Sequence, residues 1–391
     1  MKADILIAGG GIGGTVLAAL LVRGGRKVTV LERSFGPPPF LRPEILWPAA
    51  VETLCGIRGR AFWEERCIRP LGGISVNRAG KWRNAVTRDS LERSGAGPFL
   101  AQPNQLRETL LAICGADVLR GVEVTEVLRE DGKISGVRVH NVKSGASFAA
   151  EAALTVGDDG VHSTIRSAAG IGIRLRPFPV DFFVRGIPKP QAMLDDVVKL
   201  WMVSRTERSG LLAFGMMPVP GAEAACLAAV CSSAADDTAA IKRAFEELFP
   251  NPQDAPVPLD TLDFPNGFKR IRREWGHAES YGAPGAVLLG DALHPVSPAG
   301  GQGANMAVAD AAVLARLILT DQPNLVVAYE NERRRPNERG MRPSRLGTRL
   351  FSFTKIPVLG ALPGLIIPEL IARPSLFTAL LRFFARAGAN P

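Results

Sequence analysis

The feature that most constrains this chain is an apolar run near its start that breaks into glycine. Residues 4–20 have the sequence DILIAGGGIGGTVLAAL, in which five glycines fall within six positions. Residues 3–8 are short and apolar, as in a buried strand, and an alanine- and leucine-rich segment typical of a helix follows the glycines. A strand, a bare turn and a helix are therefore expected here.

The spacing of these glycines predicts a dinucleotide site. Gly9, Gly11 and Gly14 fit G-x-G-x-x-G, and a second strand-like segment, KVTVLE, ends at Glu32. This is the βαβ fingerprint in its required context, with phosphates expected at the helix N-terminus. Gly9 permits the tight turn, and Gly11 has no Cβ to block a pyrophosphate. Gly14 lets the helix pack on the strand, and Glu32 can bind both ribose hydroxyls.

Two further segments extend the prediction beyond one end of a dinucleotide. Residues 154–171, LTVGDDGVHSTIRSAAGI, indicate a strand, a turn at Asp159-Gly160, and a helix capped by Ser163. Residues 285–318 indicate a strand that ends at Asp291, then a glycine-containing loop and a long helix. A second glycine loop before a helix offers N–H groups to an electron-rich ligand. Two glycine-rich turns of this kind in one chain favour one extended ligand bound at both ends, and FAD is a ligand of that shape.

The three segments together resemble the group A flavoprotein monooxygenases, the single-component FAD-dependent aromatic hydroxylases with the p-hydroxybenzoate hydroxylase fold. The match extends over roughly residues 1 to 320, a span that includes the D-G-x-x-S-x-x-R and G-D blocks. The matched residues of these two blocks are Asp159, Gly160, Ser163, Arg166, Gly290, Asp291, Ala292, His294, Pro298, Gly301, Gly303 and Asn305.

The resemblance implies an α/β fold in which a Rossmann-like FAD-binding domain of the GR2 type carries an inserted antiparallel-sheet substrate domain and a C-terminal helical region. We expect residues 1–70, 101–177 and 275–330 in the FAD-binding domain, 71–100 and 178–274 in the substrate domain, and 331–391 in the helical segment. Strand-like alternation between residues 178 and 233 agrees with a sheet there.

The resemblance also implies roles for individual residues. Glu32 would hold the adenosine ribose, Arg42 the pyrophosphate, and Asp291 the ribityl chain. The segment 301–305 would lie along the flavin pyrimidine edge, and Pro298 near flavin C4a. The complete set expected at the cofactor is Gly9, Gly11, Ile12, Gly13, Gly14, Glu32, Arg33, Arg42, Gln102, Arg107, Asp159, Gly160, Gly290, Asp291, Pro298, Gly301, Gly303, Ala304 and Asn305.

One position departs from the family pattern. Relatives often carry an arginine or glutamine three residues before a leucine near position 100, where this chain has Pro103. Either Gln102 or Arg107 can take that role. The sequence leaves the choice open.

The activity that the resemblance implies is hydroxylation of an aromatic, phenolic or related electron-rich small molecule through a flavin C4a-hydroperoxide. FAD would be held non-covalently, with O₂ as co-substrate and NADH or NADPH as a transient reductant. No catalytic side chain and no metal site are assigned, because flavin carries the redox chemistry. Baeyer–Villiger oxidation, epoxidation or prenyl reduction on the same scaffold stays open, as does a non-catalytic flavin-binding protein.

Candidate substrate-domain residues are less specific. Apolar side chains at strand spacing are usually sheet core, and we expect a position in the sheet core for each of these candidates rather than a substrate contact. The candidates are Phe183, Arg185, Trp201, Phe214, Met216 and Met217. His294 follows the flavin loop, and a structural hydrogen bond is its expected role.

Composition narrows partners and location. The net charge is +9, yet the basic stretches lack interleaved aromatic residues, which argues against nucleic-acid binding. Five cysteines without CxxC spacing argue against disulfides and zinc, and together with the start of the chain they predict a cytoplasmic protein. No uninterrupted spanning segment is expected. Residues 356–371 are apolar, which leaves peripheral membrane contact and a lipophilic substrate open. The chain would act as a monomer or homodimer.

Overall fold

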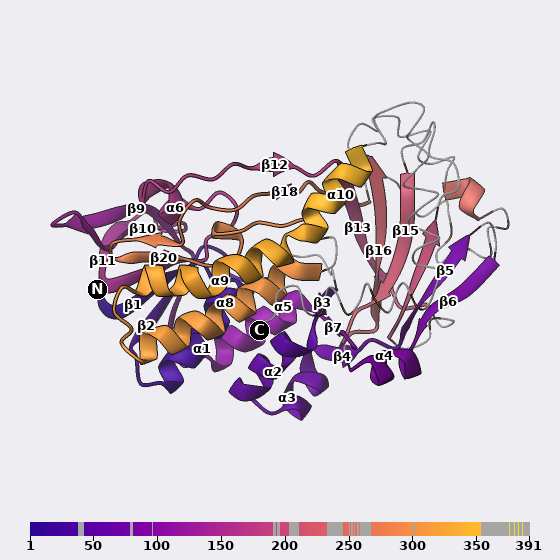
Figure 1. Ribbon diagram of the computed structural model, residues 1–391, viewed down its shortest axis with the longest axis horizontal. Coiled ribbons are helices and arrows are strands. Elements are labelled where there is room, and N and C mark those ends of the chain that lie inside the picture. The colour runs from indigo at the N-terminus through magenta and orange to yellow at the C-terminus, as the bar shows by residue number, and fades with distance from the viewer. Residues whose placement is uncertain are drawn as a thin grey trace.

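The computed structural model describes two adjoining sheets and their helices (Figure 1). It describes residues 1–37, 43–78, 81–95, 97–190, 196–202, 211–232, 245–249, 267–298 and 301–352, with isolated positions elsewhere. Arg42 and residues 356–371 lie outside the described residues, so the predictions made for them stay untested.

An eight-stranded sheet forms the first half of the molecule. Its main path is β19 (Gly282–Ala283), β20 (Ala286–Leu288), β11 (Ser147–Gly157), β1 (Lys2–Ala8), β2 (Val28–Glu32) and β8 (Asp117–Arg120), and β10 (Lys133–Asn141) and β9 (Val122–Glu130) extend it from β11. The pairs β20–β11, β11–β1, β1–β2 and β2–β8 are parallel. Strands buried on both faces are mostly apolar, as the buried residues 5–8 of β1 and 28–31 of β2 are.

Helices cover this sheet. Those that pack on it or on each other are α1 (Ile12–Arg23), α2 (Pro48–Ile57), α3 (Arg60–Arg66), α5 (Pro103–Ile113), α6 (Thr164–Ala168), α8 (Gln302–Leu319), α9 (Leu325–Gly340) and α10 (Arg342–Ser352). Among the described helices, α8 has the length and hydropathy to cross a membrane, although no such segment was expected, and 67% of it is buried inside the protein. The burial of α8 against α1 and α9 makes it a core helix of this half.

A seven-stranded sheet forms the second half. Its order is β17 (Lys269–Ile271), β13 (Val180–Pro188), β16 (Ala224–Ser232), β15 (Leu211–Pro218), β14 (Val197–Met202), β5 (Gly73–Arg78) and β6 (Lys81–Thr87), with α4 (Arg88–Ser94) after β6. All neighbours are antiparallel except β14 and β5, which run parallel. The sheet was expected to be antiparallel, but one of its strand pairs is parallel. Parallel pairing is possible there because β5 comes from an earlier part of the chain and is not joined to β14 by a hairpin.

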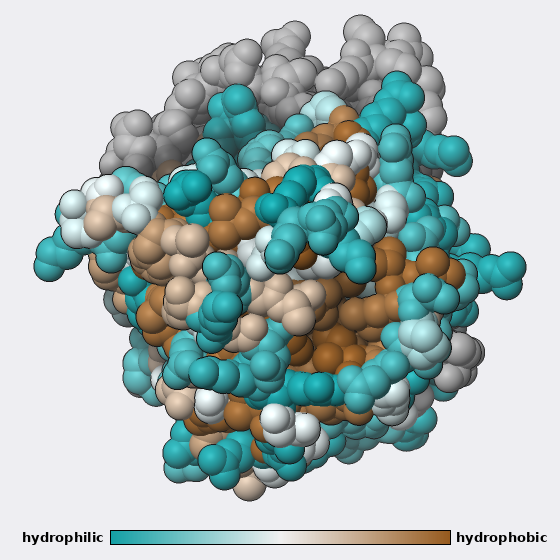
Figure 2. Space-filling model, turned by 90° about the vertical axis from the view of Figure 1, so that its left-hand side faces the viewer, coloured by the Kyte–Doolittle hydropathy of each residue, from teal (hydrophilic) through white to brown (hydrophobic). Residues whose placement is uncertain are grey.

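Two smaller sheets join the halves. One is β3 (Glu44–Leu46), β7 (Phe99–Ala101) and β4 (Ile68–Pro70), and the other is β12 (Arg176–Pro177) with β18 (Glu274–Trp275). Figure 1 shows β12 and β18 side by side in long connections between the two halves. On the face that carries the N-terminal end of the molecule, hydrophilic side chains lie outermost and apolar ones show in the recesses between them (Figure 2).

This architecture confirms the predicted fold: an α/β half built on the N-terminal fingerprint, a second half that is mainly antiparallel sheet, and helices α9 and α10 after residue 320.

Candidate cofactor and substrate site

The turn between β1 and α1 requires glycine for geometric reasons. Gly9 has φ of +100°, and a Cβ there would lie 2.2 Å from the carbonyl oxygen of Asp158. A Cβ on Gly11 would lie 2.5 Å from Oδ2 of Asp158. Gly11 is also the N-cap residue of α1 and, being glycine, forms no side-chain hydrogen bond to the first N–H groups of that helix. The first N–H groups of the helix thus face the edge of the sheet where parallel strands end, the usual place for a phosphate.

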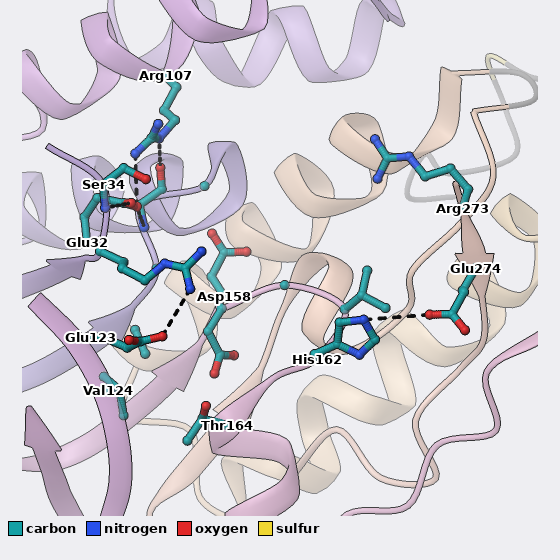
Figure 3. Close-up of a pocket in the computed structure, with 18 of the residues that line it drawn as sticks. Glu32, Ser34, Arg107, Glu123, Val124, Asp158, His162, Thr164, Arg273 and Glu274 are labelled. Atoms are coloured by element: carbon teal, nitrogen blue, oxygen red, sulfur yellow. Dashed lines mark hydrogen bonds and ion pairs between the residues drawn. The ribbon is translucent and has the colours of Figure 1, made fainter. Parts of the chain in front are cut away.

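Glu32 at the end of β2 is fixed from several sides. Its Oε2 accepts a hydrogen bond from Gly10 N at 2.8 Å, and its Oε1 accepts one from Ser34 N at 2.6 Å. Arg107 on α5 donates from Nε to Gly10 O at 2.6 Å and places Nη2 3.0 Å from Glu32 Oε2 (Figure 3). Burial would raise the pKa of Glu32, but the Ser34 hydrogen bond, the Arg107 charge and the Gly10 hydrogen bond together hold it below its ordinary value. Glu32 is therefore an ionised, oriented acceptor.

The structure gives different positions to Gln102 and Arg107, the two residues between which the sequence leaves the choice open. Arg107 lies at the glycine turn, as just described. Gln102 is the N-cap of α5, and its Oε1 accepts a hydrogen bond from Gln105 N, with Pro103 in the first turn. Gln102 is therefore used to start a helix whose next turn delivers Arg107 to the site.

Residues of the D-G segment connect two of the predicted blocks. Ser163 caps α6 by accepting from Arg166 N at 2.9 Å, as its sequence predicted. The buried Arg166 donates from Nη1 to Ala292 O at 2.7 Å and from Nη2 to Val161 O at 2.8 Å. Asp159 accepts from Ile165 N through Oδ2, whereas its buried Oδ1 has no hydrogen-bond partner within the described part of the chain.

The G-D segment forms a short 3-10 helix, η3 (Gly290–Ala292), directly beyond β20. The side chain of Asp291 is 39% exposed and lies 4.0 Å from Nη1 of Arg273. Asp291 therefore faces open space at the sheet edge, where it is accessible to a ligand.

The side chain of Asn305, in the first turns of α8, forms hydrogen bonds with the protein's own backbone. Its Oδ1 accepts from Trp47 N at 2.7 Å, and its Nδ2 donates to Ile45 O at 2.8 Å and to Gly301 O at 2.5 Å. These bonds tie the strand β3 to the loop that begins α8. Asn305 thereby sets the position of that glycine loop.

A buried polar network lies behind this loop. His294 Nε2 contacts Asp310 Oδ2, and Arg333 Nε donates to Asp310 Oδ1 at 2.7 Å. Asn337 donates to Asp310 Oδ1 at 3.0 Å and to the Tyr281 hydroxyl at 3.1 Å. Burial would raise the pKa of Asp310, but His294 and Arg333 outweigh it and lower it to about 2. The structural hydrogen bond expected of His294 is thus part of a network that fixes η3 to α8 and α9.

Two cavities adjoin along the edge of the eight-stranded sheet. A groove of about 1350 Å³ runs over the glycine turn and Glu32, and a second cavity of about 520 Å³ lies between the α8 loop and the seven-stranded sheet. Four residues line both of them: Gly11, Asp158, Gly160 and Arg273. A single long ligand can therefore occupy both.

The predicted cofactor residues divide between these cavities. The groove is lined by Gly9, Gly11, Glu32, Arg33, Arg107, Asp159 and Gly160. The second cavity is lined by Gly11, Ile12, Gly13, Gly160, Gly290, Asp291, Pro298, Gly301, Gly303 and Ala304. Three predicted residues, Gly14, Gln102 and Asn305, lie outside both linings. The side-chain oxygens of Gln102 and Asn305 accept hydrogen bonds from backbone N–H groups of the protein instead.

The predicted substrate-domain residues also divide. Phe214 and Met217 line the second cavity. Phe183, Trp201 and Met216 lie in the hydrophobic cluster of the seven-stranded sheet, to which Phe214 also belongs, and Arg185 lies outside both cavity linings. For most of them, the sheet-core role that strand spacing predicts agrees with these positions.

The residues present fit FAD. A bare glycine turn and a fixed acidic acceptor at one end suit a pyrophosphate and ribose. An unpartnered buried acceptor, Asp159 Oδ1, offers a place for a ligand hydroxyl. The adjoining apolar cavity begins at a second glycine loop, which suits a flat ring.

Comparison with known proteins identifies the family. The family model described as FAD binding domain matches residues 2–343. The chain belongs to this FAD-binding family. Kynurenine 3-monooxygenase of Salinispora arenicola is 28% identical to it over 370 residues, covering 84% of this chain and 76% of that protein. The 6-methylpretetramide 4-monooxygenase of Streptomyces rimosus is 28% identical over 413 residues, covering 98% and 92%.

A solved structure agrees on the fold of this family member. PqsL of P. aeruginosa, crystallised with 2-aminobenzoylacetate, superposes with a TM-score of 0.71 at 24% identity, covering 93% of this chain and 99% of that one. The family model and the two curated relatives confirm the predicted family, cofactor and enzyme class: the chain is an FAD-dependent group A monooxygenase.

Asp158 is not among the residues that the sequence predicts for this monooxygenase. Asp159 fits the D-G motif, whereas the side chain that reaches the glycine turn is that of its neighbour Asp158. Two consecutive acids at the end of a buried strand were the available signal. Arg273, which lines both cavities, had no signal beyond its place in a basic stretch.

Proposed function

We propose that this monooxygenase hydroxylates a small, predominantly apolar aromatic compound bound in the cavity between the α8 loop and the seven-stranded sheet. The observation that carries the proposal is the lining of that cavity. Its walls are formed by Phe182, Val184, Leu200, Ala213, Phe214, Met217, Val230 and Ile271. Such walls bind by burial of apolar surface, at about 25 cal/mol per Å².

Charged side chains in this cavity lie on the cofactor side. Asp158, Arg273 and Asp291 line it near the groove, and Glu44 lies on β3. The strands opposite contribute apolar atoms. A substrate with a polar group at one end and a hydrophobic ring at the other would therefore place its polar group toward the cofactor.

The residues of this chain supply position and a dry environment. FAD, when bound, supplies the redox chemistry: it accepts a hydride from NADH or NADPH and activates O₂. Glu32, Arg107 and the glycine turn hold its nucleotide end, and Asp291 would hold the ribityl chain. Pro298 and the loop 301–304 border the apolar cavity at the reacting end. The apolar walls exclude water from that end, which protects the reaction from side hydrolysis.

We infer that the enzyme acts in the cytoplasm, as a monomer or homodimer. The C-terminal segment for which peripheral membrane contact was considered lies outside the described residues.

The proposal is tested with purified, FAD-loaded enzyme. NADH and NADPH consumption is measured with O₂ and a matched panel of neutral phenols and their carboxylated analogues, and products are identified by mass. Neutral phenols should stimulate consumption and gain one oxygen atom, and each carboxylated analogue should be at least about tenfold poorer, because burying its charge costs more than 1.4 kcal/mol. A preference for the carboxylated analogues contradicts the proposed substrate class. A product with an inserted ring oxygen or an epoxide contradicts hydroxylation.

A further inference from the structure

Asp158 lies at the centre of the cofactor site. It follows β11 directly, and its N–H donates to Ala8 O at 2.8 Å, so its place is fixed by the pairing of β11 with β1. Its Oδ2 accepts from Gly14 N, on α1, at 2.8 Å. A Cβ on Gly11 would lie 2.5 Å from Oδ2, and a Cβ on Gly290 would lie 2.7 Å from Oδ1. The carboxyl group thus fills the space that these glycines leave.

The position of Asp158 coincides with the middle of the expected cofactor. Asp158 lines both the groove and the apolar cavity. Figure 3 shows it between the Glu32–Arg107 pair and His162. A dinucleotide that extends from one cavity to the other must pass this carboxyl group.

The charges that face Asp158 are mainly negative. Asp159 is its neighbour in the chain, Glu32 faces it from the end of β2, and Asp291 faces it from η3. Of the nearby cations, Arg107 is engaged with Glu32, and Arg273 lies 4.0 Å from Asp291. The helix α1 presents the Gly14 N–H and has no acidic residue in its first turn.

These surroundings favour the neutral form of Asp158. Burial raises the pKa of Asp158 well above its ordinary value, and the charges of Asp291, Asp159 and Glu32 raise it further, against the Gly14 hydrogen bond, which lowers it. A pyrophosphate adds further negative charge. An ionised Asp158 would repel this charge.

We propose that Asp158 holds FAD as a neutral carboxylic acid, so that FAD binding takes up a proton at any pH at which Asp158 of the free protein is ionised. One oxygen of the acid accepts from Gly14, and the other carries the proton and donates it to an oxygen of the cofactor. The proton taken up from solvent forms an O–H bond on Asp158 and stays there while FAD is bound, and no other covalent bond is made or broken. The proposal rests on FAD as the cofactor and is independent of the substrate class.

Isothermal titration of FAD into flavin-stripped wild-type protein tests the proposal. Titrations in two buffers of different ionisation enthalpy, between pH 6 and pH 9, give the number of protons exchanged. We expect uptake of up to one proton per FAD. We also expect Kd to rise by up to about tenfold per pH unit wherever the free protein has ionised Asp158 and the complex has not. Absence of proton uptake up to the most alkaline pH at which the free protein stays folded, or release of a proton at any pH, overturns the proposal.

Two variants test whether the proton taken up on FAD binding is bound by Asp158. Asp158→Asn keeps a neutral side chain of the same shape at every pH, so its FAD binding should take up no proton and its Kd should not change with pH. Glu126→Gln is the control: Glu126 is an exposed carboxylate outside both cavity linings, paired with Arg138 at 3.0 Å, so this variant should keep the wild-type proton uptake. Uptake that persists in Asp158→Asn overturns the assignment to Asp158.

The wild-type proton count remains decisive even where Asp158→Asn fails to fold. The outcome is separable from the proposed function, because FAD-loaded enzyme that turns over neutral phenols retains that activity whether or not cofactor binding takes up a proton.

Discussion

The two adjoining cavities are built in different ways. The groove over the glycine turn is made from short motifs in which a turn, a cap and a strand end supply the contacts within a few residues, as at Gly9, Gly11 and Glu32. The apolar cavity is made from alternate side chains on strands drawn from distant segments, among them Leu200 and Val230. Local contacts thus form the groove to which we assign FAD, and long-range strand pairing forms the cavity next to it.

The difference extends to the cores beside the two cavities. The network around Asp310 holds the cofactor half through buried ion pairs and hydrogen bonds. The seven-stranded sheet is held by an aromatic cluster, in which Phe214 contacts Trp201, Phe245 and Phe249. Changes in one half should therefore affect the cofactor, and changes in the other should affect the substrate.

The largest expected effect is that of Gly9→Ala on the cofactor half. Alanine at a positive φ costs roughly 1–2 kcal/mol, and the overlap with Asp158 O adds roughly 1–3 kcal/mol. FAD affinity should fall by about 100-fold, measured by titration of the flavin-stripped protein. Gly25→Ala is the control, because Gly25 also has positive φ, at +83°, but its Cβ would meet nothing within 4 Å. If Gly9→Ala bound FAD as tightly as Gly25→Ala does, the turn would tolerate a side chain at Gly9, contrary to this expectation.

A smaller effect, confined to the other half, is expected of Ala228→Leu. Ala228 lines the apolar cavity from β16, so the larger side chain occupies space that we assign to substrate. KM for the preferred phenol should rise by about tenfold, or about 1.4 kcal/mol, while flavin content stays unchanged. Ala112→Leu, at an exposed position on α5, is the matched control and should leave KM unchanged. Loss of flavin in Ala228→Leu would mean that the two halves are not separable in this way.

A third effect, on stability rather than on binding, concerns pH and again distinguishes the halves, because all four histidines of the chain lie in the predicted FAD-binding segments. His277 contacts the Tyr281 hydroxyl at 2.9 Å, and burial, followed by the charges of His294 and Arg334, lowers its pKa to about 3. Because this folded value is below the ordinary 6.5, the unfolded chain takes up the proton first as the pH falls. The stability contributed by neutral His277 is complete above pH 6.5 and is lost toward pH 3.

Denaturant unfolding at pH 7 and pH 5 measures this loss. We expect wild type to lose about 2 kcal/mol between the two pH values through His277, and His277→Gln to lose correspondingly less. His162→Gln should behave as wild type, because the side chain of His162 is 82% exposed. An identical pH dependence in His277→Gln and wild type would contradict a neutral, buried His277.

The same contrast explains what the sequence could predict. The turn at Gly9 and the cap at Ser163 depend on neighbouring residues, so spacing alone indicated them. The position of Asp158 against Gly14 depends on the pairing of β11 with β1, across 144 positions of the chain, and no local pattern encodes it. Likewise, only the start of α5 shows that Arg107 faces the glycine turn while Gln102 caps the helix. The substrate cavity was the least predictable part, because its lining comes from several strands at once.

The mixed pairing of β5 with β14 has a consequence for biosynthesis. The seven-stranded sheet needs residues 73–78 from early in the chain and ends with β17, at residue 271. The eight-stranded sheet begins with β1 and is completed by β20, at residue 288. A nascent chain that stops short of residue 271 therefore has neither sheet complete, and the apolar strands it has already made have no full set of neighbours. Both sheets therefore gain their last strands late in the chain and close together in sequence.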